Sequence, residues 1–285
     1  MVKGERERLM EKLVIAVAPT GSFTFRNQTP YVPITPKAIA EEVYECWKAG
    51  ASIAHIHVRE DDGTPTMNLD RYRETVERIQ DKCDILISLT SSGKVNPTDE
   101  ERLAVCDLQP HFASFNAGSM NFGEIPFMNS PEFMRKLAKR MQENNVKPEI
   151  EIFEQGMIGN ATKIANEGLI DAPYHYQFVL GAPGGTPATP KNLIHLLDHL
   201  PENSTWGVVA FENQVVLHSL AIHLGGHVRV GMEDNYYYRP GELAKSNVDF
   251  VKRVAQLSHD IGREIATPEE AKKILNLKTV EVDIS

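Results

Sequence analysis

The sequence has only three cysteines, Cys46, Cys83 and Cys106, and they lie far apart. Their spacing fits neither a disulfide framework nor a cysteine zinc site, so we expect free thiols in a reducing compartment. No apolar run reaches the roughly 18–20 residues that are needed to span a bilayer. Residues 1–12 are charged and lack the apolar core of an export signal. These absences predict a soluble, cytoplasmic protein without a membrane partner.

Basic residues are in the minority. The 285 residues include 30 lysines and arginines against 39 aspartates and glutamates, which gives a formal net charge of −9. An acidic chain argues against nucleic acid as a partner, although it can still form a local basic pocket for an anionic substrate. Nucleotide-binding fingerprints are also missing, because no GxGxxG follows the first predicted strand and no GxxxxGK[ST] occurs.

Alternation of short apolar stretches with helical stretches dominates the rest of the chain. Helix starts are marked by Thr35-Pro36, by Ser130-Pro131 and by a capping box of Thr98 with Glu101. Strands that alternate with helices predict parallel pairing through right-handed crossovers. The predicted strands are 13–18, 52–58, 84–89, 112–115, 149–153, 174–180, 205–210 and 227–230.

Eight strand–helix units in this length fit a single-domain (β/α)8 TIM barrel better than an open α/β sheet, which is the alternative fold. We expect the barrel core over about residues 13–260. The last long helix is predicted over 242–259, and a short helical tail over 263–285.

The stretch 54–59 reads Ala-His-Ile-His-Val-Arg at the end of the second predicted strand. Side chains alternate along a strand, so His55 and His57 point to the same face. Taken alone, the pair equally fits two hydrogen-bonded core histidines. A second β-branched stretch, 225–235, ends in Glu233 and Asp234. Two histidines and a carboxylate with an open position suit catalytic zinc or a related divalent ion.

A closed barrel would bring these two stretches together, because only the first strand separates the second from the eighth. One ion at the rim could then contact His55, His57 and Glu233. A structural zinc, the competing interpretation, would be closed by four protein ligands. Further polar residues follow other predicted strands at the same carboxyl end, where barrels carry their active sites. They are Thr20, Ser91, Ser92, Asn116 and Glu154.

The chain resembles the β-keto acid cleavage enzymes over nearly its whole length. The resemblance implies a zinc-bearing TIM barrel that forms a homo-oligomer, with a tetramer favoured. It also implies a reaction in which a β-keto acid condenses with acetyl-CoA and releases acetoacetate and a new acyl-CoA. The stretches that carry the resemblance are 18–21, 55–59, 114–122, 178–181 and 225–235.

Carried over residue by residue, the resemblance assigns the zinc ligands to His55, His57 and Glu233. It matches Arg229 and Asp234 to the catalytic pair. It also places Ser91 and Asn116 at substrate contacts. Hydroxyl and backbone donors of Thr20, Ser91, Ser92 and Gly93 are further candidates for binding the substrate carboxylate.

One departure from the family pattern concerns the substrate. Members that cleave the amino substrate place a glutamate just after the first Thr-Gly, whereas here Thr20-Gly21 is followed by Ser22-Phe23-Thr24-Phe25. An unpaired ammonium is costly in a partly buried pocket. We therefore expect a β-keto acid with a neutral tail. The alternative function is another metal-dependent TIM-barrel aldolase or hydrolase that does not use acetyl-CoA.

Overall fold

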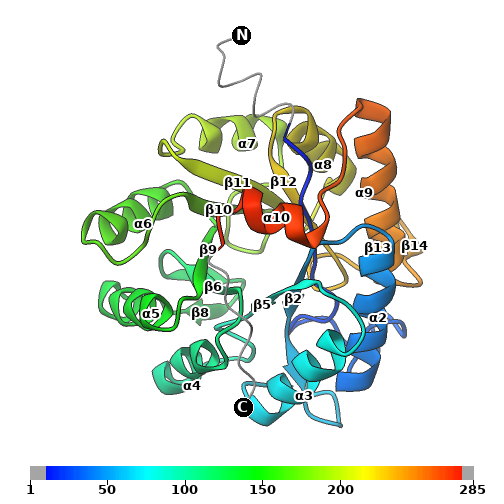
Figure 1. Ribbon diagram of the computed structural model, residues 1–285, viewed down its shortest axis with the longest axis horizontal. Coiled ribbons are helices and arrows are strands. Elements are labelled where there is room, and N and C mark those ends of the chain that lie inside the picture. The colour runs from blue at the N-terminus through cyan, green and yellow to red at the C-terminus, as the bar shows by residue number, and fades with distance from the viewer. Residues whose placement is uncertain (1–10, 278–285) are drawn as a thin grey trace.

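The computed structural model describes residues 11–277, and its centre is a closed barrel of eight parallel strands ringed by helices (Figure 1). Around the barrel the order is β1-β12-β11-β10-β9-β6-β5-β2, and β1 pairs with both β2 and β12. The predicted TIM barrel is confirmed and the open sheet is wrong. The strands are β1 Ile15–Val17, β2 Ile53–Ile56, β5 Leu86–Leu89, β6 Phe112–Asn116, β9 Lys147–Ile152, β10 Tyr174–Leu180, β11 Ser204–Ala210 and β12 His227–Val230.

The helices marked in the sequence by Thr35-Pro36, Thr98 and Ser130-Pro131 begin at those residues. Thr35 accepts a hydrogen bond from the Ala38 amide at the start of α2, and Thr98 with Glu101 forms the expected capping box. The helices are α2 Pro36–Lys48, α3 Leu69–Gln80, α4 Asp99–Ala104, η1 Val105–Leu108, α5 Pro131–Glu143, α6 Gly156–Asn166, α7 Pro190–Leu197, α8 Gln214–His223, α9 Asn247–Ile261 and α10 Pro268–Ile274.

Three antiparallel hairpins at the carboxyl end of the barrel depart from the predicted pattern. The prediction of a helix from residue 242 is wrong, because β13 (Tyr237–Arg239) pairs with β14 (Glu242–Leu243) before α9 begins. The other hairpins are β3 (Val58–Arg59) with β4 (Pro65–Thr66), and β7 (Met120–Phe122) with β8 (Ile125–Phe127). Because β3 is separate, β2 ends at Ile56 and His57 lies between two strands.

The amino end of the barrel is covered by α10, which crosses it in Figure 1. Ala271 and Leu275 pack there against the first residues of several strands, including Ile53, Leu86 and Phe112. This apolar layer closes that end of the barrel. Of the tail predicted over 263–285, residues 278–285 lie outside the described part of the chain.

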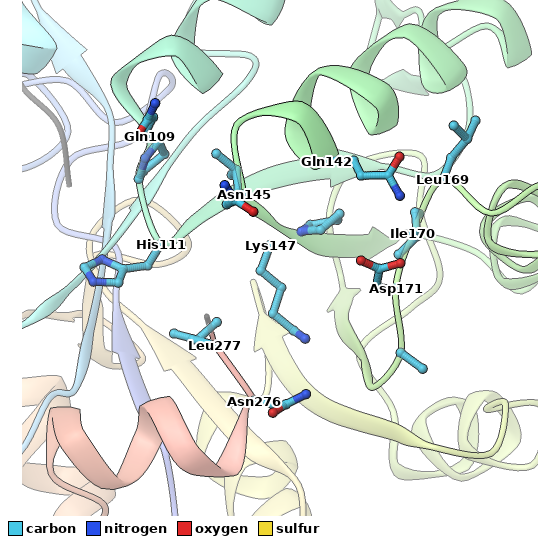
Figure 2. Close-up of a pocket in the computed structure, with 14 residues that line it drawn as sticks. Gln109, His111, Gln142, Asn145, Lys147, Leu169, Ile170, Asp171, Asn276 and Leu277 are labelled. Carbon is cyan, nitrogen blue, oxygen red and sulfur yellow. The ribbon is translucent and has the colours of Figure 1, made fainter. Parts of the chain in front are cut away.

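Beside α10 lies a polar recess, shown in Figure 2. Its side chains form hydrogen bonds with the backbone of nearby loops. Lys147 donates to the Pro173 carbonyl at 2.7 Å, and Gln142 donates to the Gly168 carbonyl at 3.0 Å. The His111 ring accepts from the Ile87 amide at 3.1 Å. These bonds explain the polar lining as support for the loops at this end.

Within residues 11–277, no helix combines the length and the apolar character that a membrane crossing requires.

His218 on α8 is fully buried, and neither ring nitrogen has a hydrogen-bond partner within the described chain. Burial, aided by the charge of Arg253, lowers the pKa of His218 to about 3. A histidine in an unfolded chain titrates near about 6.5. Unfolding below that pH therefore takes up a proton, and stability falls by about 1.4 kcal/mol per pH unit between about pH 6.5 and pH 3.

We expect His218→Leu to remove this part of the acid sensitivity. Between pH 7.5 and pH 5 the variant should lose roughly 2 kcal/mol less free energy of unfolding than the wild type, because one proton is no longer taken up. Urea unfolding at the two pH values measures this difference. His111 and His175, whose burial lowers their pKa to about 4, supply the same acid-sensitive background in both proteins. An unchanged pH dependence in the variant would contradict the prediction.

Candidate active site

The two histidines and Glu233 meet at the carboxyl end of the barrel. β1 joins the neighbouring strands, since Ala16 pairs with Ile53 of β2 and with Arg229 of β12. The Glu233 Oε1 atom lies 3.3 Å from His57 Nε2 and 3.7 Å from His55 Nε2. One nitrogen or oxygen of each residue lies within 4.8 Å of the others, so the three can hold one metal ion.

Two glycines allow this convergence. Gly231 adopts φ +147°, and a Cβ there would lie 2.0 Å from the Ala18 carbonyl oxygen. A Cβ at Gly21 would lie 2.7 Å from Glu233 Cγ. The loop after β1 therefore packs directly against Glu233. Arg59 fastens that loop by donating to the carbonyls of Gly21 and Thr24 at 2.7 Å.

Arg229 is buried among three carboxylates. It binds Asp234 through two hydrogen bonds of 2.8 and 3.1 Å, contacts Glu151 at 3.2 Å and also pairs with Glu233. Burial raises the pKa of Glu151 to about 7 and that of Asp234 to about 6, although Arg229 opposes both shifts. For Glu233, Arg229 and the two histidines outweigh burial and lower the pKa.

The donor set fits a divalent cation. Three carboxylates face one guanidinium, and burial raises the pKa of two of them, so a bound cation would stabilise their ionised forms. Glu233 Oε2 is buried and has no hydrogen-bond partner among the described residues. Two imidazoles and one carboxylate suit zinc and related ions.

The pKa values of the two histidines are shifted in opposite directions. Burial opposes protonation of both rings. For His55 the nearby Glu233 and Glu149 carboxylates overcome this effect, and the pKa is raised. For His57 burial prevails and the pKa is lowered. A neutral ring is the form that binds a metal ion.

A cavity of about 280 Å³ opens above the cluster. His55, His57, Glu233, Asp234 and Arg229 lie along it, and its remaining wall is largely apolar. Phe122 stacks on Phe23 with ring centroids 5.2 Å apart and meets Phe153 and Phe211 edge to face. The apolar side chains along the cavity are Phe23, Val95, Pro97, Phe122, Ile125, Pro126, Phe127, Met128, Phe153, Val179 and Phe211.

The predicted substrate-binding residues divide into two groups. Ser92 and Asn116 line the cavity, and Asn116 Oδ1 is buried with no hydrogen-bond partner in residues 11–277. Thr20, Ser91 and Gly93 lie behind the cavity wall. Thr20 and Ser91 donate to the carbonyls of Pro33 and Ser114, and the Gly93 amide faces the Met67 sulfur.

Two glutamates differ from the sequence-based picture. Glu154, which was expected among the polar strand ends, is exposed and accepts from the Gly156 amide at 2.8 Å, where α6 begins. Glu151, which the sequence analysis missed, points into the barrel and binds Arg229. The signal for it is the alternation Glu149-Ile150-Glu151-Ile152, in which two acids share one face of a strand.

Fold and site together define a TIM-barrel enzyme with a candidate metal centre at the carboxyl end of its strands. Residues 12–277 match the family model "beta-keto acid cleavage enzyme", and the chain belongs to that family.

Two relatives of named function match along at least 98% of their length. The chain is 45% identical over 274 residues to a 3-keto-5-aminohexanoate cleavage enzyme of Fusobacterium nucleatum, which covers 95% of this chain and 100% of the relative. It is 35% identical to the 3-oxoadipate:acetyl-CoA acetyltransferase of Cupriavidus necator, and the match covers 96% of this chain and 98% of that relative. The solved apo structure of ObcA superposes with a TM-score of 0.75 at 20% identity, covering 87% of this chain and 66% of ObcA, which supports the barrel fold.

Proposed function

We propose that the protein condenses a β-keto acid with acetyl-CoA and releases acetoacetate and a new acyl-CoA, with zinc as the resident metal ion. The observation that carries this proposal is the meeting of His55, His57 and Glu233 with the Arg229–Asp234 pair at one cavity. The relatives support it, because their names pair β-keto acids with acetyl-CoA.

The reaction begins with loss of a proton from C2 of the β-keto acid. Asp234, whose side chain is 1% exposed, is the proposed base, and its two bonds to Arg229 hold the carboxylate in place and favour its ionised form. A divalent ion held by His55, His57 and Glu233 would supply Lewis-acid stabilisation of the negative charge formed on the substrate.

The remaining steps need no protein nucleophile. The C2 carbanion attacks the acetyl carbonyl of acetyl-CoA and the CoA thiolate leaves. That thiolate then attacks the original keto carbon, and cleavage of the bond from this carbon to C2 gives the new acyl-CoA. The departing C2 is protonated to give acetoacetate. Cys46 and Cys106 are buried away from the cavity, in agreement with this scheme.

For the substrate carboxylate we assign direct contacts to Ser92 and Asn116, which line the cavity. Thr20, Ser91 and Gly93 would act by holding the loops behind them, since their polar groups bind the scaffold.

A neutral, apolar tail suits the cavity. The acids along it, Glu151, Glu233 and Asp234, all belong to the Arg229 cluster. The rest of the wall is mostly aromatic and aliphatic, and its polar side chains, which include Lys94 and Arg102, add no further acid. An ammonium group on the tail would meet no carboxylate there. The chain is 45% identical to an enzyme named for an amino substrate, so the proposal requires that a wall position such as Phe23 sets the tail preference while fold and site persist.

We expect Phe23→Glu to reverse the preference for the tail. A carboxylate at this position pairs with an ammonium and is left unpaired beside an apolar tail. The kcat/KM ratio of 3-keto-5-aminohexanoate to 3-oxohexanoate should rise at least about tenfold, which corresponds to about 1.4 kcal/mol.

Phe25→Glu is the matched control. Phe25 is exposed to a similar extent, 41% against 44%, but it packs over Arg59 and does not line the cavity. Its ratio should stay near the wild-type value. If Phe23→Glu leaves the kcat/KM ratio of the two substrates unchanged, Phe23 does not contact the substrate tail.

A substrate panel tests the proposed function. The protein is incubated with acetyl-CoA and a series of β-keto acids, and mass spectrometry detects acetoacetate together with the new acyl-CoA. A chelator-treated sample serves as the metal-free control. Turnover that is lost on chelation supports the proposal. If the metal is bound and no keto acid reacts, the acetyl-CoA chemistry is excluded and an aldolase or hydrolase activity becomes the better hypothesis.

We further propose that the enzyme is a cytoplasmic homo-tetramer. The exposed apolar side chains of Ile194 on α7 and of Val215 and Val216 on α8 support an oligomer contact, since these helices are neighbours. Sedimentation equilibrium measures the subunit number.

A further inference from the structure

Both candidate metal-binding histidines face a serine hydroxyl with the ring nitrogen that points away from Glu233. His57 Nδ1 lies 3.0 Å from Ser22 Oγ, and His55 Nδ1 lies 3.1 Å from Ser88 Oγ. Ser22 belongs to the loop after β1 and Ser88 to β5, so two separate elements supply the same contact. All four side chains are buried.

Each serine uses its single proton elsewhere. Ser22 donates to the Gly93 carbonyl at 2.8 Å, and Ser88 donates to Glu149 Oε2 at 2.8 Å. A carbonyl oxygen only accepts. The Glu149 carboxylate oxygen likewise accepts the proton of Ser88. A hydroxyl has one proton to donate, so toward the histidine each serine oxygen acts as the acceptor.

We infer that Ser22 and Ser88 are positioning residues that hold His57 and His55 with the proton on Nδ1. The Nε2 lone pairs, which lie 3.3 and 3.7 Å from Glu233 Oε1, are then free to bind a metal ion. This inference rests on the metal centre of the proposed function. It adds residues outside the ligand set that fix which nitrogen of each ring coordinates.

The two contacts differ in how replaceable they are. Glu149 Oε2 lies 3.4 Å from His55 Nδ1 and can accept its proton when Ser88 is absent. For His57 Nδ1, the described residues offer the Ser22 hydroxyl as the hydrogen-bond partner. Without that hydroxyl, the proton of His57 is free to move to Nε2 and to bond to Glu233, which competes directly with metal binding.

The test measures the zinc dissociation constant of the metal-stripped full chain by competition with a chromophoric chelator. We expect Ser22→Ala to weaken zinc binding about 10–100-fold, as is usual for partners of metal-bound histidines. Ser88→Ala should weaken it less, because Glu149 replaces the serine. Ser22→Thr, which keeps the hydroxyl, should restore binding to within about threefold of wild type.

Ser52→Ala is the matched control, because Ser52 is equally buried and its hydroxyl has no hydrogen-bond partner within residues 11–277. Its zinc affinity should equal that of the wild type, and thermal unfolding confirms that each variant is folded. A spectroscopic readout uses the zinc-loaded chain with 15N-labelled histidine. The Nδ1 proton of His57 should be protected from solvent exchange in the wild type and exchange faster in Ser22→Ala.

Unchanged zinc affinity and unchanged Nδ1–H exchange in Ser22→Ala would overturn the inference. A proton found on Nε2 of the zinc-loaded rings would also overturn it, as would failure of the wild type to bind zinc. None of these measurements requires acyl-CoA chemistry. If zinc binding behaves as expected while no β-keto acid reacts, the positioning role stands and the proposed function fails.

Discussion

His57→Ala should release the metal ion and lower kcat/KM at least about a thousandfold. His55, His57 and Glu233 are the three candidate ligands, with ligand atoms within 4.8 Å of one another. Removal of the His57 imidazole leaves only two of them. A bound divalent ion contributes several kcal/mol of stabilisation to a developing negative charge, and about 4 kcal/mol corresponds to a thousandfold in rate. Metal analysis after dialysis and steady-state kinetics with acetyl-CoA and a reactive keto acid measure the two effects.

The control for this variant is His175→Gln. His175 is also a buried barrel histidine, but its Nδ1 contacts Thr205 at 2.9 Å and the ring does not line the cavity. We expect His175→Gln to keep the metal ion and most of the activity. If His57→Ala retains a full equivalent of metal ion and wild-type turnover, the site assignment is wrong.

The meeting of His55, His57 and Glu233 could be predicted from sequence because it depends on two regular features. Alternation along a strand places His55 and His57 together, and barrel closure makes β1 the only strand between them and Glu233. Helix starts were equally accessible, since proline and capping hydroxyls act on neighbouring backbone groups. Both kinds of inference use rules that do not require side-chain partners to be known.

The residues whose hydrogen bonds could not be foreseen from the sequence depend on such partners. Thr20 and Ser91 were expected to face the substrate, but their hydroxyls satisfy the carbonyls of Pro33 and Ser114 across distant loops. The role inferred for Ser22 follows from a hydrogen bond to Gly93, 71 positions away. The alternation of residues along a strand does not show where such a hydroxyl points. A polar residue near a strand end could therefore not be assigned to the cavity or to the scaffold.

Asp234→Asn should lower kcat about 10²–10⁴-fold, the usual contribution of a general base. The amide oxygen can still accept a hydrogen bond from Arg229, so the local structure should persist. What the amide cannot do is accept the C2 proton. Since Asp234 is not among the proposed ligands, zinc content should stay at the wild-type level and KM should change little.

Exchange of the C2 protons isolates the role of Asp234 from the later steps. In D2O without acetyl-CoA, the wild type should incorporate deuterium at C2 of a β-keto acid above the spontaneous rate, whereas Asp234→Asn should not. If the variant still catalyses exchange, the proton goes to another group. Glu151 is then the next candidate, because it faces the same cavity, binds the same guanidinium at 3.2 Å and has a pKa that burial raises to about 7. The exchange rate of Glu151→Gln would decide between the two carboxylates that share Arg229.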